Sequence, residues 1–167
     1  GFLEHTDAQI GRLVDSLADL GELDDTLIVL LSDNGASQEG GPLGVLNEWK
    51  FFNFILETPD EAVARLDDIG GPNSHTNYPW GWAQAGNTPF KYFKQTVHEG
   101  GTRDPLIISW PKGIHAGGGI RSQFQHVNDI MPTLLDLTGI SPPAQVDGVA
   151  QQRMDGISMR YSFDHPD

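Results

Sequence analysis

The chain contains no cysteine among its 167 residues. Disulfides, thiolate nucleophiles and cysteine-based zinc sites are therefore excluded as sources of stability or chemistry. The absence does not identify a redox compartment, because cysteine-free proteins occur in all of them. Localisation stays unknown on this ground: the periplasm and the cytoplasm both suit the chain if it is bacterial.

Long apolar runs and basic residues are also scarce. No apolar run approaches the roughly 18 residues that a membrane-spanning helix requires, so we expect no membrane span. The 23 acidic residues outnumber the 10 basic residues and give a net charge of −13. This charge disfavours nucleic acid as a partner. An anionic substrate would need a local positive site, such as a bound metal ion, to attract it against the field of the whole chain.

What the chain does contain is a succession of helix and strand patterns, which predicts an α/β fold. Apolar residues from Leu3 to Leu20 follow helical spacing. The unbroken apolar run within residues 26–32 suits a parallel strand that is covered on both faces. A second buried strand is predicted at residues 105–110. The helix that follows it is expected to be capped by Asp129 and to end at Gly139.

The middle of the chain, residues 35–90, is rich in glycine, proline, asparagine and tryptophan. Within it, the sequence "ETPDEAVARLDDIGG" predicts a short helix, because Pro59 and acidic residues stand near its start and two glycines follow its end. The rest is too long for an ordinary connector and is a candidate functional loop. After Gly139, the proline-rich sequence "SPPAQVDG" is expected to connect to a last short segment.

The two ends of the chain lack the features of a complete domain. The apolar stripe of the first helix reaches almost to residue 1 without an initiating methionine, and the end "YSFDHPD" has no obvious closing element. We therefore expect an internal fragment of a larger protein, cut through a longer helix.

A carboxylate and an amide follow the first predicted strand directly. Ligands of parallel α/β sheets bind beyond the carboxyl ends of the strands, and Asp33 and Asn34 stand at such an end. Carboxylate and amide oxygens are the ligands that Ca²⁺ and Mg²⁺ prefer. The same Asp-Asn-Gly sequence also closes strands as a simple turn, without any ligand.

Basic residues gather just before the second predicted strand: Lys91, Lys94, His98 and Arg103. Basic groups that reach the same sheet edge as a metal would stabilise an oxyanion. The alternative is that the lysines are simply solvated and that Arg103 pins the turn at Gly100 and Gly101 by hydrogen bonds to carbonyls.

Taken together, these segments resemble the sulfatase family, the arylsulfatase-type enzymes of the alkaline phosphatase-like superfamily. The resemblance is carried, in the family's order, by "GFLEHTDAQIGRLVDSL", "DTLIVLLSDNG", "KQTVHEGGTRDPLIISWP", "HVNDIMPTLLDLTGI" and "DGISM". It implies a fragment of an alkaline phosphatase-like sandwich, with a mostly parallel central sheet flanked by helices. It covers only the later part of the catalytic domain. The resemblance implies that residues 1–140 form the C-terminal part of the sulfatase catalytic domain, truncated at its N-terminus, and that residues 141–167 form a connector and the start of a C-terminal region.

The resemblance also implies roles for individual residues. Asp33 and Asn34 match two of the family's Ca²⁺ ligands, and Lys94 matches the catalytic lysine that contacts the sulfate group. His75 and His98 have no secure counterpart and are retained only as substrate-binding candidates. Lys91 has no supported role, whereas His126, Glu99 and Arg103 are interpreted as packing or capping residues.

Several parts of the family's site are not found in the chain. The family nucleophile is a formylglycine made from Cys or Ser in a Cys/Ser-x-Pro-x-Arg motif, and the superficial match "SPPAQ" has Gln145 in place of the arginine. The paired N-terminal aspartates that complete the Ca²⁺ site are absent, as are the family's other catalytic lysine and its histidines. All of these would precede Gly1, so the missing N-terminal half of the domain is itself an expected partner.

The function implied for the intact parent is hydrolysis of a small-molecule sulfate ester with Ca²⁺ and a formylglycine, and the isolated fragment is expected to be inactive. One alternative is a phosphate or phosphonate ester hydrolase of the same superfamily. A second is a non-catalytic remnant of the fold. A third is a carbohydrate- or anion-binding module that uses Trp80 and Trp82 for stacking.

Overall fold

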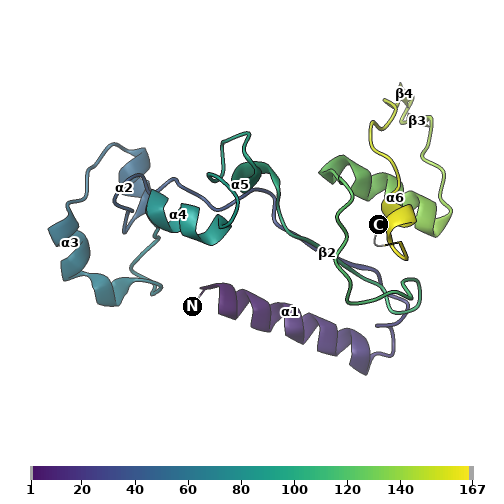
Figure 1. Cartoon of the computed structure of the whole chain (residues 1–167), viewed down its shortest axis with the longest axis horizontal. Coiled ribbons are helices and arrows are strands. Elements are labelled where there is room, and N and C mark those ends of the chain that lie inside the picture. Colours follow the sequence, from purple (N-terminus) through teal and green to yellow (C-terminus); the bar gives the residue numbers. More distant parts are fainter. Residues whose placement is uncertain (1, 166–167) are drawn as a thin grey trace. The chain divides into compact units, whose positions relative to one another are not determined.

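The computed structural model describes residues 2–165. The chain divides into two compact units. Unit 1 comprises residues 1–16 and 28–108, and unit 2 comprises residues 17–27 and 109–167. Figure 1 labels most of their helices and strands. No helix among the described residues is both long enough and apolar enough to cross a membrane.

The first predicted helix is confirmed as α1 (Phe2–Asp19). It forms because its apolar residues recur on one face, and Ile10 and Val14 on that face are half-buried. Gly21 ends it with a backbone φ of 72°, a conformation that glycine adopts without a steric penalty. The helix begins at Phe2, and its continuation upstream stays a prediction.

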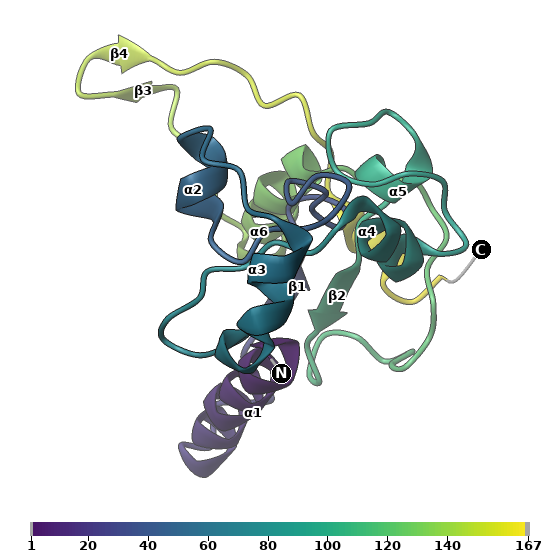
Figure 2. The same ribbon diagram turned by 90° about the vertical axis from the view of Figure 1, so that its left-hand side faces the viewer.

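The two predicted strands pair with each other as β1 (Ile28–Leu31) and β2 (Leu106–Ser109). A hydrogen bond of 3.2 Å from Ser32 N to Pro105 O joins the end of β1 to the start of β2. This end-to-start contact is that of an antiparallel pair. Figure 2 labels both strands.

The expectation that β1 is covered on both faces was wrong. Leu30 and Leu31 are 40% and 41% exposed, so the strand is not covered on both faces. An apolar run does not reveal which partner a strand will have, and here that partner is a short antiparallel strand. The mostly parallel central sheet stays a prediction.

The middle of the chain is more regular than its composition suggests. It folds into short helices within unit 1: α2 (Glu48–Phe52), α3 (Pro59–Ala64), the 3-10 turn η1 (Leu66–Asp68) and α4 (Trp80–Asn87). A further short helix of this unit, α5 (Glu99–Thr102), follows the middle segment. Isolated bridges pair Val45 with Asn77 and Asn47 with His75. The helix predicted within residues 57–71 is confirmed as α3, followed by η1.

Unit 2 centres on α6 (Ile130–Thr138), which the 3-10 turn η2 (Val127–Asp129) precedes. The later elements are β3 (Gln145–Val146), β4 (Val149–Ala150) and the 3-10 turn η3 (Met159–Ser162). β3 and β4 form an antiparallel hairpin where the sequence predicted only a connector (Figure 2). The buried side chains of Met159 and Phe163 pack in this unit.

Asp129 has a different role from the predicted helix cap. Its side chain makes no capping bond to α6. It instead accepts hydrogen bonds from His126 N at 2.8 Å and from Ile157 N at 2.9 Å, and so ties η2 to the chain before η3. The capping interpretation of His126 is confirmed, because its Nδ1 atom accepts a hydrogen bond from Asn128 N. The predicted end of α6 at Gly139, with φ of 68°, is also confirmed.

Candidate functional site

The first half of the candidate site is the loop that follows β1, residues 32–41, called the Asp33 loop below. Asp33 is exposed at its start. The side-chain nitrogen of Asn34 donates to Gly35 O at 3.0 Å, and Ser32 Oγ donates to Asn34 O at 2.8 Å. With the amide nitrogen engaged, Asn34 presents its side-chain oxygen as the group suited to bind a cation.

The second half is the loop that precedes β2, residues 88–104, called the Lys94 loop below. Lys94 N donates to Ala36 O at 3.0 Å, which joins this loop to the Asp33 loop directly. Gln38 Nε2 donates to Gln95 Oε1 at 2.6 Å and adds a side-chain contact between the same two loops. The structure therefore brings together the two segments that the sequence singled out separately.

The ammonium group of Lys94 forms an ion pair with Glu39. Its Nζ atom lies 3.2 Å from Glu39 Oε1 and 3.1 Å from Glu39 Oε2. A hydrogen bond from the Ser37 hydroxyl, followed by the contacts with Lys94, holds the pKa of Glu39 below its ordinary value. Glu39 was not among the residues predicted from the sequence, and no local pattern marks it.

Asn87, the last residue of α4, braces the two loops from one side. Its Oδ1 atom accepts from Ala36 N at 3.2 Å, and its Nδ2 atom donates to Gly100 O at 2.7 Å and to Tyr92 O at 3.0 Å. The two loops also approach each other closely at Gly35. A Cβ atom there would collide with the carbonyl oxygen of Gly100, so only glycine fits.

A second carboxylate lies near Asp33. Burial, together with the negative charge of Asp33, raises the pKa of Asp104 above its ordinary value. The Oδ1 atom of Asp104 is buried and has no hydrogen-bond partner among the described residues. The sequence analysis did not identify Asp104.

The two histidine candidates differ in position. His98 lies in the Lys94 loop at the start of α5, where its exposed ring packs 4.6 Å from the ring of Tyr92. His75 lies in the bridge with Asn47, and its Nδ1 atom is 3.1 Å from Glu48 Oε1. His98 thus shares a loop with Lys94, whereas the contacts of His75 belong to the start of α2.

The remaining basic residues have structural contacts. Arg103 pairs with Glu99 at 3.2 Å and lies over the ring of Phe90 at 4.9 Å. These contacts agree with the packing interpretation of both residues, but they differ from the predicted hydrogen bonds to the turn carbonyls. Lys91 is exposed, and its backbone carbonyl accepts from Gly100 N.

Among residues 2–165, no three or more side chains of His, Asp or Glu are gathered in a manner suited to a metal ion. Asp33 and Asn34 alone would therefore be an incomplete ligand set for Ca²⁺, which takes 6–8 oxygen ligands.

Unit 1 also contains an apolar groove of about 990 Å³. Its lining includes Leu46, Val63, Leu66, Tyr78 and Trp82. The carboxylate of Glu57 stands in its wall, where it accepts from Leu46 N at 2.6 Å and pairs with Lys50 at 3.3 Å. Trp82, one of the two stacking candidates, is thus part of a mainly apolar surface.

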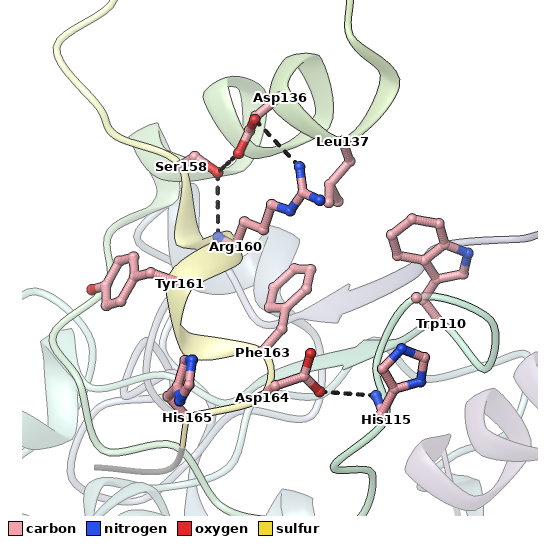
Figure 3. Close-up of a pocket in the computed structure, with 11 residues that line it drawn as sticks. Trp110, His115, Asp136, Leu137, Ser158, Arg160, Tyr161, Phe163, Asp164 and His165 are labelled. Atoms are coloured by element: carbon pink, nitrogen blue, oxygen red, sulfur yellow. Dashed lines mark hydrogen bonds and ion pairs between the residues drawn. The ribbon is translucent and has the colours of Figure 1, made fainter.

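A polar pocket of about 680 Å³ lies in unit 2 (Figure 3). Its charged groups are paired internally: Asp136 accepts from Ser158 Oγ at 2.7 Å and lies 3.7 Å from Arg160. Asp164 accepts from the backbone nitrogens of Ala116 and His115, and these bonds hold its pKa below the ordinary value. The predicted site residues do not line this pocket, so we assign its polar groups to holding η3 in place.

Comparison with known proteins relates most of the chain to one family. The family model described as Sulfatase matches residues 1–140. An uncharacterized sulfatase of Schizosaccharomyces pombe is 36% identical over 145 residues, which cover 85% of this chain. An arylsulfatase of Klebsiella aerogenes is 32% identical over 163 residues, or 95% of the chain. A human N-acetylgalactosamine-6-sulfatase is 28% identical over 145 residues, or 86% of the chain.

The matched regions are a minor part of each relative. They amount to 24% of the Schizosaccharomyces pombe protein, 32% of the Klebsiella aerogenes protein and 20% of the human protein. The chain therefore spans at most about a third of the length of these three relatives.

Proposed function

Since the chain belongs to the sulfatase family, we propose that the whole protein hydrolyses sulfate esters of small molecules and that the Asp33 and Lys94 loops supply part of its catalytic site. The observation that carries the proposal is the hydrogen bond of 3.0 Å between Lys94 N and Ala36 O. It joins the loop with the candidate cation ligands to the loop with the candidate catalytic lysine. The names of the relatives make aryl sulfates and sulfated amino sugars the first substrate classes to test.

The donor set of the Asp33 loop suits Ca²⁺. Asp33 offers an exposed carboxylate, and Asn34 offers an amide oxygen whose orientation is fixed by its bond to Gly35. A bound Ca²⁺ would hold sulfate oxygens and reduce the repulsion between anions. Asp33 and Asn34 would hold the ion, together with ligands from outside these 167 residues.

Lys94 would neutralise charge that develops on the ester oxygen as it leaves. Its ammonium carries three hydrogen-bond donors on a flexible stem, and its side chain is 29% exposed, so an oxyanion can reach it. Because the chain as a whole carries a charge of −13, the positive charge of Lys94 is needed to make the site locally favourable for sulfate.

The nucleophile of the proposed reaction lies outside this chain. The chain has no cysteine, and it contains no complete Ser-x-Pro-x-Arg sequence. We therefore place the formylglycine, which would attack the sulfur atom when present, in another part of the whole protein. Residues 1–167 would bind and orient the sulfate group but would not turn it over alone.

The test is an assay of the full-length protein with an aryl sulfate and the matching aryl phosphate. Turnover of the sulfate is expected, and Lys94→Ala is expected to lower kcat by about 100- to 1000-fold, the usual cost of removing one stabiliser of an oxyanion. Lys91→Ala is the control, because Lys91 is an exposed lysine of the same loop. It is expected to leave kcat unchanged.

Each alternative has its own outcome in this assay. Preferential turnover of the phosphate would replace the proposal by a phosphate ester hydrolase. No turnover of either ester, with a folded protein, would favour a non-catalytic remnant. Near-normal sulfate turnover by the Lys94→Ala variant would overturn the role of Lys94.

A further inference from the structure

Lys94 is fixed at both ends. Its backbone nitrogen is bonded to Ala36 O at 3.0 Å, and its ammonium group is bonded to both carboxylate oxygens of Glu39. Ala36 and Glu39 belong to the same short loop. The Asp33 loop therefore positions both the backbone of Lys94 and its charged ammonium group.

Glu39 is itself held in place. Ser37 Oγ donates to Glu39 Oε2 at 2.8 Å and accepts from Glu39 N at 3.4 Å, so the turn closes on the carboxylate. The residue before Glu39, Gln38, is also bonded to the Lys94 loop through its contact with Gln95. The carboxylate is thus a rigid partner rather than a mobile surface acid.

Stability alone gives little reason for this pair. The side chains of Lys94 and Glu39 are each 29% exposed, and ion pairs near the surface contribute only about 0–1 kcal/mol to folding. The pair joins residues 55 positions apart and uses both carboxylate oxygens. A geometry this specific constrains the position of the ammonium more than it adds to the free energy of unfolding.

We propose that Glu39 is a positioning residue that aims the ammonium group of Lys94 at the sulfate. The proposal rests on the proposed function, because it concerns the same lysine. An ammonium has three N–H donors. Both oxygens of Glu39 lie on the same side of the ammonium, which leaves donors on its other side for an oxygen of the substrate.

The first experiment compares Glu39→Gln with the unmodified full-length protein in the aryl sulfate assay. Glutamine keeps the length of the side chain but removes its charge and one acceptor. We expect kcat to fall by about ten- to hundredfold, the range in which a small misplacement of a reacting group costs rate, with KM changed by less than about twofold. Glu39→Asp keeps the charge on a shorter stem and is expected to restore part of the loss.

The matched control is Asp68→Asn. Asp68 forms a comparable pair with Arg65 at 2.8 Å, also in unit 1, so its loss removes an ion pair of similar exposure away from the two loops. We expect this variant to keep kcat. Ser37→Ala, which leaves the carboxylate but removes its hydrogen bond, is expected to lower kcat by less than Glu39→Gln. Unchanged kcat in Glu39→Gln, with kcat lost in Lys94→Ala, would overturn the proposal.

A second measurement does not depend on activity. An amine-acylating reagent is applied to the folded protein, and the labelling of Lys94 is measured relative to exposed Lys91 by peptide mass spectrometry. Because Glu39 engages the ammonium of Lys94, we expect slow labelling that rises several-fold in Glu39→Gln and not in Asp68→Asn. Equal labelling of Lys94 in all three proteins would overturn the proposal. A protein without sulfatase activity would defeat the proposed function, and the labelling would still decide whether Glu39 holds Lys94.

Discussion

The side chain of Asn87 shows how much one residue can organise. It accepts one hydrogen bond from the Asp33 loop at Ala36 N and donates two to the Lys94 loop, at Tyr92 O and Gly100 O. An amide is suited to this place because it carries an acceptor and two donors. Neither a carboxylate nor an aliphatic side chain can make all three bonds.

We predict that Asn87→Asp destabilises the protein. Aspartate still accepts from Ala36 N, but it cannot donate to the two carbonyls, and its charge would face them. The expected loss is about 1–3 kcal/mol in the free energy of unfolding, the cost of unsatisfied polar groups that are partly buried. Urea denaturation measures it.

The control for this variant is Asn73→Asp. It adds the same negative charge at an exposed position whose backbone oxygen, rather than its side chain, accepts a bond from Arg65. Equal losses for the two variants would show that added charge, and not the brace at Asn87, is responsible.

Sequence reasoning at the scale of residues found Asp33, Asn34 and Lys94 because they stand in recognisable local patterns. The joining of their loops is shown by the structure, while their roles stay predictions. Glu39 and Asn87 were missed, since their partners lie 55 and 51 positions away along the chain. Such contacts depend on the tertiary fold, and neither residue type is unusual enough to signal them.

At the scale of elements, α3 is the clearest case of a helix specified by its own sequence. Thr58 Oγ1 accepts from Glu61 N at 3.3 Å, and Glu61 Oε2 accepts from Thr58 N at 2.8 Å. This capping box satisfies two backbone donors, and Pro59 is preorganised for the first turn. Because every one of these contacts is local, the helix could be predicted.

We predict that Thr58→Ala weakens α3 by about 1 kcal/mol, the usual cost of losing a side-chain cap. Amide hydrogen exchange within residues 60–64 reports the change, and exchange there is expected to become faster. Thr58→Ser retains the hydroxyl and is the matched control. If alanine and serine gave the same exchange rates, the hydroxyl would not be what stabilises the start of α3.

The strands were less predictable than the helices. The apolar run of β1 gave its location, but it did not reveal that its neighbour is antiparallel, because the partner is chosen by tertiary contacts. The hairpin of β3 and β4 did have a signal in the sequence, the dipeptide Asp147-Gly148 at its turn. Both residues have positive φ in the structure, at 49° and 80°. Asp-Gly is a favoured hairpin turn, which the proline-rich context obscured.

At the scale of the whole molecule, acidic charge is the dominant electrostatic property. Because the net charge is −13, each ionised carboxylate is repelled by the others. This repulsion is strongest where acidic residues lie close together. Asp104 shows this locally, because burial and the charge of Asp33 disfavour its ionised form.

This raised pKa leads to a prediction for the pH dependence of stability. The ionised form of Asp104 costs free energy in the folded state, so the cost is fully present above its raised pKa and disappears below its ordinary value of 3.8. Asp104→Asn is therefore expected to raise the Tm near neutral pH. The gain should shrink as the pH falls through the raised pKa.

Thermal unfolding across this pH range measures the effect. Asp67→Asn, which changes an exposed acid of η1, is the control for the general removal of a negative charge. A gain in Tm for Asp104→Asn that stayed constant down to acid pH would contradict the electrostatic explanation.

The order of motifs along the chain predicted the family, and the match over residues 1–140 confirms that prediction. The family could be found because several weak patterns in a fixed order are together specific. The candidate site could be predicted only in part. Its contacts within the chain depend on the fold, and its proposed nucleophile is absent from the sequence.

The close approach at Gly35 has a consequence for the lifetime of the protein. Packing against Gly100 requires glycine there, and the residue before it is Asn34. Because glycine has no side chain to obstruct it, the backbone nitrogen of Gly35 can attack the side-chain carbonyl carbon of Asn34, which releases ammonia and forms a succinimide that water opens to aspartate or isoaspartate. The same packing that joins the two loops thus exposes a proposed cation ligand to chemical ageing, and each such event adds a negative charge to a chain that is already strongly acidic.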